Sequence, residues 1–182
     1  WSSDVCSSDL AELRRKGALA PVSLSGSELH QASVRGLVRA QPLPRADGVA
    51  ALFLVNRTQR KADEVAAEIR TRFPDVNAVS GWPDGDVDLV LNATSLGLQP
   101  GDGSPLDESQ FPLRRARAVY DMIYRPAETP LLRAAKAAGC ATANGLGMLL
   151  YQGAKALELW TGGAQIPVGT MRAAAEAALQ RK

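Results

Sequence analysis

A cationic segment that also carries a hydroxyl group follows a short apolar run at residues 49–55. Asn56, Arg57 and Thr58 come directly after this run, and Lys61 follows one helical turn later. A guanidinium can stack on a purine while its donors pair with phosphate oxygens. In doubly wound α/β domains an acidic residue near the end of the second strand selects NAD, whereas arginine there admits the 2′-phosphate of NADP. The segment therefore predicts NADP, and the alternative is a solvated turn that opens a surface helix.

Two later apolar runs also end in polar residues. The run at residues 87–93 leads into Asn92, Thr94 and Ser95, which offer short donors and acceptors. The run at residues 118–123 ends near Met122 and Tyr124. Ligands of open α/β sheets bind outside the carboxyl ends of the strands, so both sets are candidates for one crevice. The alternatives are a strand-end cap for the first set and core packing for Met122.

A glycine turn precedes a later helix. Gly145 and Gly147 open the stretch that carries Gln152, with Met148 one turn before it on the same face. Free backbone N–H groups at a helix start and the missing side chain of glycine allow a ligand to approach closely. A single glutamine on a helix is usually solvated. Gln152 is therefore a candidate ligand contact only if its face of the helix turns toward the ends of the other strands.

The order of the elements predicts an α/β fold. We expect strands at residues 49–55, 87–93, 118–123 and 140–143, and helices near 59–73, 129–138, 148–160 and 168–180. This alternation is typical of a Rossmann-like doubly wound parallel sheet, here with C-terminal helices. Residues 11–47 contain three prolines and no run of four apolar residues, and they suggest only a short helix over residues 32–40.

Composition limits the classes of partner. The chain has 182 residues, a net charge of +2 and 5% aromatic residues, which fits one domain without a nucleic-acid platform. No apolar run approaches the roughly 20 residues that span a bilayer, so no membrane partner is expected. Cys6 and Cys140 are interpreted as free thiols in a reducing, cytoplasmic compartment. His30 has no second ligand at a spacing typical of metal sites, so no metal site is predicted. The oligomeric state stays open, with a homodimer among the alternatives.

The chain divides into three parts by sequence character. Residues 1–10 repeat Ser-Ser-Asp and resemble a translation of sequencing-adapter DNA, so we expect them to be non-native. Residues 11–47 are an atypical first βα region, either replaced or corrupted by a frame error. Residues 48–182 are the expected NADP-binding domain with its C-terminal helices.

Four ordered motifs from about Gly48 onward are similar to those of shikimate dehydrogenases. They are Asn-Arg-Thr after a strand, Asn-Ala-Thr-Ser-x-Gly, Tyr-Asp-x-x-Tyr-x-Pro followed by Thr-Pro-Leu-Leu, and Gly-x-Gly-Met-Leu-x-x-Gln. The resemblance implies reversible reduction of 3-dehydroshikimate to shikimate with NADPH, in aromatic amino acid biosynthesis. The substrate would then be a small molecule, and quinate is an alternative to shikimate.

The resemblance also implies roles for individual residues. Asn56, Arg57, Thr58 and Lys61 match the adenosine-phosphate clamp, with Lys61 where arginine is usual. Residues that match positions near the cofactor are Asn92, Thr94, Ser95, Met122 and Gly145, the last two beside the nicotinamide. Tyr124 and Gln152 match substrate contacts, and Gln152 would hydrogen-bond a ring hydroxyl of shikimate.

Two parts of the family pattern have no match. The substrate domain, which carries a catalytic lysine and aspartate, has no counterpart, so no catalytic residue is assigned in this chain. A glycine-rich loop that binds the pyrophosphate at a helix N-terminus is expected between about Leu24 and Arg35, where Gly26 and Gly36 are present but the fingerprint is not. A non-catalytic dinucleotide-binding or interaction module is therefore the alternative function.

The missing acid/base pair generates the first prediction. The purified 182-residue chain is expected to show no cofactor-linked oxidation of shikimate, because no group is placed to take the hydroxyl proton. The measurement is NADPH formation followed by absorbance. Detectable shikimate-dependent turnover by this chain would refute the prediction.

Overall fold

The computed structural model describes residues 37–40 and 49–180, apart from the side chains of residues 37–40 and of Gln180. The strands are β1 (Leu37–Ala40), β2 (Ala51–Leu54), β3 (Asn77–Ser80), β4 (Val87–Asn92), β5 (Ala116–Asp121) and β6 (Ala141–Asn144). The helices are α3 (Gln59–Arg72), the short η1 (Leu113–Arg115), α4 (Pro130–Ala137), α5 (Leu146–Trp160) and α6 (Val168–Gln180). Every strand and helix predicted from residue 49 onward is confirmed, with ends that differ by at most two residues.

The strands form one sheet in the order β3-β2-β1-β4-β5-β6. β2 pairs with β3 in parallel, and β4, β5 and β6 are parallel to one another. Since β2 and β4 both run antiparallel to β1, they run in the same direction as each other. The carboxyl ends of five strands therefore lie at one edge of the sheet, and this edge carries the segments that the sequence singled out.

β1 corrects two expectations. Residues 37–40 form a strand, so the short helix predicted over residues 32–40 is wrong there. β1 is antiparallel to both neighbours, so the sheet is not parallel throughout. Parallel neighbours need a crossover of about a dozen or more residues. Residues 41–50 between β1 and β2 are too few for a crossover helix, which explains the antiparallel pairing.

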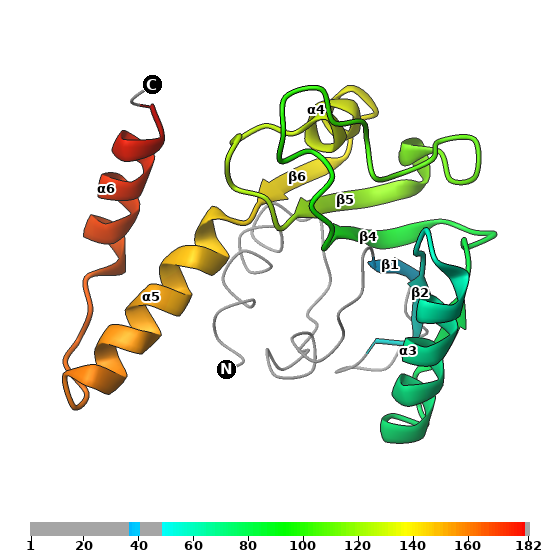
Figure 1. The fold of residues 1–182 in the computed structure, drawn as a ribbon, viewed down its shortest axis with the longest axis horizontal. Helices are drawn as coiled ribbons and strands as arrows, with labels where there is room; N and C mark the ends of the chain where they lie inside the picture. Colours follow the sequence, from blue (N-terminus) through cyan, green and yellow to red (C-terminus); the bar gives the residue numbers. More distant parts are fainter. Residues whose placement is uncertain (1–36, 41–48, 181–182) are drawn as a thin grey trace.

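Helices cover both faces of the sheet, as the doubly wound fold requires. α3 packs Ala62 and Ala66 against Leu52 and Leu54 of β2, and this cluster also contacts Leu91 of β4. The opposite face is covered by α4 and by the segment between β4 and β5, in a second cluster of buried side chains. Its members include Val90, Val119, Phe111, Leu113, Leu131, Leu132 and Ala135. Figure 1 shows α4 above β5 and β6, with α3 beyond β2 at the lower right.

β3 was not expected from the sequence. It reads Asn-Ala-Val-Ser, and only Ala78 is buried. Such a short, polar segment has no strand pattern of its own, and its pairing with β2 at the sheet edge makes it a strand.

The last two helices form a hairpin that extends away from the sheet. Figure 1 shows α5 leaving the end of β6 and α6 returning beside it. The helices are in close contact at Gly153, where an added Cβ would lie 3.4 Å from Met171 Cε. Within residues 37–40 and 49–180, no helix has the length and apolarity that a bilayer crossing demands.

Several sequence-based expectations lie outside the described residues. They concern the adapter-like residues 1–10, most of the atypical region 11–47, the glycine-rich loop expected between Leu24 and Arg35, and the side chains of Cys6 and His30.

The contact between α3 and β2 depends on small side chains. Ala66 is fully buried, so Ala66→Leu is expected to lower the free energy of unfolding by about 1–3 kcal/mol through overpacking. Ala67 is exposed on the same helix, and Ala67→Leu should stay within about 0.5 kcal/mol of the parent. Urea unfolding followed by circular dichroism measures both. Equal stability of the two variants would contradict the close packing of α3.

Candidate functional site

Four of the strands that end at this edge are followed by the same local structure. The side chains of Asn56, Asn92, Asp121 and Asn144 each accept a hydrogen bond through Oδ1 from the backbone N–H two residues later, at 2.9 to 3.1 Å. Asn and Asp favour such turns because the short side chain replaces a backbone acceptor. Each turn bends the chain out of its strand and presents the next residues at the edge of the sheet.

The turn after β2 presents the cationic segment. Asn56 Oδ1 accepts from Thr58 N at 2.9 Å, and α3 begins at Gln59. Gln59 also donates to Ser80 Oγ of β3 at 2.6 Å, which fixes the start of the helix against the sheet.

The cations of this segment differ in their pairing. Arg60 forms an ion pair with Glu64 one turn along α3. Arg57 and Lys61 are exposed, and neither side chain has a hydrogen bond or ion pair to any described residue. No acidic residue occurs in the first turn of α3. Two cations and the Thr58 hydroxyl are thus available to an anion at this strand end.

The turn after β4 contains Asn92, Thr94 and Ser95. Asn92 is 2% exposed, and its amide donates to Asp121 Oδ1 at 3.0 Å and to the Leu96 carbonyl at 3.4 Å. Its Oδ1 accepts from Thr94 N, so all polar atoms of the side chain are occupied. Thr94 Oγ1 accepts from Leu96 N at 3.1 Å, and Ser95 is exposed. Asn92 and Thr94 therefore shape the turn, and Ser95 is its exposed hydroxyl-bearing residue.

Asp121, the last residue of β5, is completely buried. Its Oδ1 accepts from Asn92 Nδ2 at 3.0 Å and from Ile123 N at 3.1 Å, and its Oδ2 accepts from Thr129 Oγ1 at 2.6 Å. Burial raises the pKa of the carboxyl above its ordinary value of 3.8, although the three hydrogen bonds oppose the shift. Since the folded pKa lies above the unfolded one, the native state loses stability as the pH rises through the interval between them. The carboxylate is thus kept at an energetic cost, which its three donors partly offset.

Met122 and Gly145 lie in direct contact. A Cβ at Gly145 would be 2.0 Å from the Met122 carbonyl oxygen and 2.6 Å from its carbon. Gly145 N donates to the Ile123 carbonyl at 3.3 Å, and Met122 N donates to the Asn92 carbonyl at 3.0 Å. The start of α5 is therefore held against the ends of β4 and β5, and only glycine permits this approach.

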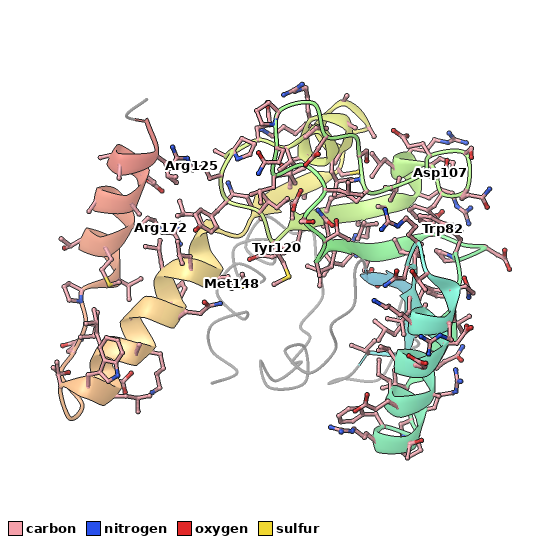
Figure 2. The ribbon with its side chains drawn as sticks, viewed as in Figure 1. Trp82, Asp107, Tyr120, Arg125, Met148 and Arg172 are labelled. Carbon is pink, nitrogen blue, oxygen red and sulfur yellow. The ribbon has the colours of Figure 1, made fainter. Side chains whose placement is uncertain are left out.

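Tyr124 and Gln152 are less constrained. Tyr124 is exposed after β5, and Gln152 is half-buried on α5. Neither side chain has a hydrogen bond to a residue in the described ranges. Gln152 lies one helical turn after Met148, which Figure 2 labels near the start of α5. The structure thus brings Met122 and Gly145 together, whereas it records no direct contact between Tyr124 and Gln152.

Sequence reasoning missed Asp121 and Thr129. Thr129 caps α4, because its Oγ1 accepts from Leu132 N at 3.3 Å and Pro130 follows at the first helical position. A threonine followed by proline is a recognisable helix start. An aspartate at the end of an apolar run was also visible, but its pairing with Thr129 and Asn92 depends on the sheet.

Comparison with known proteins finds similarity to shikimate dehydrogenases. A family model described as the shikimate 5′-dehydrogenase C-terminal domain matches residues 145–176. The shikimate dehydrogenase (NADP(+)) of Halobacterium salinarum is 40% identical over 176 residues, covering 94% of this chain and 63% of that protein. The chain is similar to the shikimate dehydrogenases over most of its own length.

Similar solved structures share the fold of this chain. One shikimate dehydrogenase in complex with NADP+ is 34% identical, with a TM-score of 0.60 over 71% of this chain and 47% of that one. A quinate dehydrogenase from Corynebacterium glutamicum, in complex with NAD, is 30% identical, with a TM-score of 0.58 over 71% of this chain and 47% of that one. The α/β fold class with its Rossmann-like sheet is confirmed.

The match to the family is partial in length. The chain spans 63% of the Halobacterium salinarum relative and 58% of a shikimate dehydrogenase (NADP(+)) from Methanocella arvoryzae. An alignment over 94% of the chain also includes residues before 48, so the similarity begins earlier than the motifs indicated.

The Met122 contact predicts a strict requirement for glycine. Gly145→Ala is expected to lower the free energy of unfolding by at least about 1–3 kcal/mol, because the new methyl group meets the Met122 backbone. Gly169→Ala is the control, since an added Cβ there has no neighbour within 4 Å. Urea unfolding of both variants tests this, and a Gly145→Ala protein as stable as the control would contradict the contact.

Proposed function

We propose that this chain forms the NADP-binding part of an oxidoreductase that reversibly reduces 3-dehydroshikimate to shikimate. The single observation that carries the cofactor choice is the pair of exposed cations Arg57 and Lys61 after the end of β2, which have no partner among the described residues. The curated relatives are named shikimate dehydrogenase (NADP(+)), which supports the reaction. These relatives are longer than this chain, which spans 63% and 58% of their length, so the proposed activity is that of a protein of their full length.

The donor set at this turn fits a 2′-phosphate. Arg57 provides a forked guanidinium, Lys61 a point charge and Thr58 a hydroxyl, and no acidic residue lies in the first turn of α3 to repel the anion. Hydrogen bonds to charged groups contribute about 1.5–3 kcal/mol each. Two such bonds would favour NADPH over NADH by a factor of about a hundred or more.

Further along the edge, the contact of Gly145 with the Met122 backbone holds the start of α5 against the end of β5. We place the nicotinamide beside these two residues, because they match the positions next to the nicotinamide in the motifs of shikimate dehydrogenases. The bound cofactor supplies the hydride. The residues of this chain orient the ring, and the turn 92–97 flanks it.

For the substrate, Tyr124 and Gln152 are the proposed contacts. Both carry polar groups without a partner among the described residues, on the two segments that Gly145 joins. A phenol and an amide suit the hydroxyl groups of a shikimate-like polyol. Quinate is the second candidate, because a quinate dehydrogenase is among the similar solved structures.

The setting is proposed to be cytoplasmic. The support is Cys140, a free thiol that is half-buried with its Sγ 3.2 Å from the Leu113 carbonyl. Thiols of this kind persist where the compartment is reducing.

The cofactor proposal predicts a difference between two neighbouring arginines. Arg57→Ala is expected to weaken NADPH binding by about tenfold or more while NADH binding stays unchanged, because one guanidinium–phosphate contact is lost. Arg60→Ala is the matched control, since Arg60 already pairs with Glu64. Fluorescence titration of NADPH and NADH with the 182-residue chain measures both affinities.

Two outcomes would contradict the proposal. Equal affinity of the parent chain for NADPH and NADH would exclude a 2′-phosphate clamp. An equal loss of NADPH affinity in Arg57→Ala and Arg60→Ala would show that general positive charge, rather than the Arg57 contact, attracts the cofactor.

A further inference from the structure

We propose that Asp121 is a positioning residue that holds the nicotinamide side of the cofactor site in place, independently of the 2′-phosphate clamp. The inference rests on the proposed function, because it assigns a task to a buried group within that site. Asp121 touches no ligand position itself, since its side chain is completely buried.

The Asp121 carboxylate joins three separate segments. Through Asn92 Nδ2 it holds the turn after β4, and through Ile123 N it holds the segment that carries Met122 and Tyr124. Through Thr129 Oγ1 it holds the start of α4. Each bond is 2.6 to 3.1 Å long, and both Asn92 and Thr129 are themselves buried. One carboxylate therefore fixes the relative position of turns that are far apart in the sequence.

The same network reaches α5. Ile123, which donates to Asp121, accepts from Gly145 N through its carbonyl. Gly97 lies at the end of the turn that follows β4 and packs against Thr129. A Cβ added at Gly97 would lie 3.3 Å from Thr129 Cβ. Displacing Asp121 would thus release the contact of Met122 with Gly145 and the turn 92–97 together.

A carboxylate suits this place better than an amide. Three donors point at it, and an ionised carboxylate offers only acceptors. In Asp121→Asn, one oxygen can still accept from Asn92 and Ile123, while the new amide donates to Thr129 Oγ1. Asp121→Asn therefore keeps all three hydrogen bonds, with the donor and acceptor exchanged in the one to Thr129. Asp121→Ala loses all three hydrogen bonds and leaves the buried donors unsatisfied.

The phosphate clamp belongs to a different network. Its turn is held by Asn56 and by the hydrogen bond between Gln59 and Ser80, and within the described part of the chain none of these residues is hydrogen-bonded to Asp121. In the sheet, β1 separates β2 from β4. Loss of Asp121 should therefore affect the nicotinamide half of the site and leave the clamp intact.

This separation defines the test. NADPH, which spans both halves, and adenosine 2′,5′-bisphosphate, which reaches only the clamp, are titrated against the parent chain, Asp121→Ala and Asp121→Asn. Asp121→Ala is expected to bind NADPH about tenfold more weakly, with its affinity for the bisphosphate within about twofold of the parent. Asp121→Asn should recover most of the NADPH affinity.

Two control variants separate positioning from stability. Asp88→Ala removes a second buried aspartate, which lies on β4 at the opposite edge of the sheet and pairs with Arg117. Leu113→Ala lowers stability from a fully buried core position away from the site. Neither control should change the ratio of the two affinities. Equal losses for both ligands in Asp121→Ala, or unchanged NADPH binding, would overturn the proposal.

A second measurement does not depend on cofactor binding. Amide hydrogen exchange of residues 93–97 and 122–124 should accelerate by about tenfold or more in Asp121→Ala relative to Leu113→Ala. If the parent chain binds neither ligand, the proposed function fails, and exchange alone then decides the positioning role. Equal exchange in the two variants would overturn it.

Discussion

The structure depends on how the strands end at one edge of the sheet. A strand that stops there leaves backbone groups without ladder partners, and buried groups of this kind must find other hydrogen bonds. Asn56, Asn92, Asp121 and Asn144 solve this by accepting the N–H two residues on. Because the strands before these turns run in the same direction, the four turns open along the same edge of the sheet, which presents polar groups at fixed positions.

This constraint divides the predicted site residues into two kinds. Asn56 and Asn92 use their side-chain carbonyls to form the turns, and Asn92 is buried with its amide also occupied. Arg57, Lys61 and Ser95 follow those turns and remain exposed. The asparagines of the motifs therefore determine where the backbone goes, and the residues after them are the ones available to a ligand. A sequence motif does not distinguish the residues that form the turns from the residues that are available to a ligand.

Much of the fold was predictable because it is recorded in local patterns. Apolar runs and helix starts located every strand and helix from residue 49 onward except β3 and η1. β3 has no pattern of its own, and its pairing with β2 defines it. The direction of β1 follows from a connection too short for a crossover. Asp121 was visible as a residue, but its partners Asn92 and Thr129 come from other elements.

The sequence by itself determined the resemblance to shikimate dehydrogenases, through four motifs in a fixed order, and the cationic chemistry of Arg57, Thr58 and Lys61. Residue type and spacing suffice for this because they set the charge and donor groups directly. The tertiary structure alone decided that the Arg57 and Lys61 side chains lack partners among the described residues, and that Met122 lies against Gly145. It also decided that one buried carboxylate links three segments, which are the turn after β4, the segment after β5 and the start of α4. These properties arise from distances between segments far apart in the chain, which depend on strand direction and packing rather than on any local pattern.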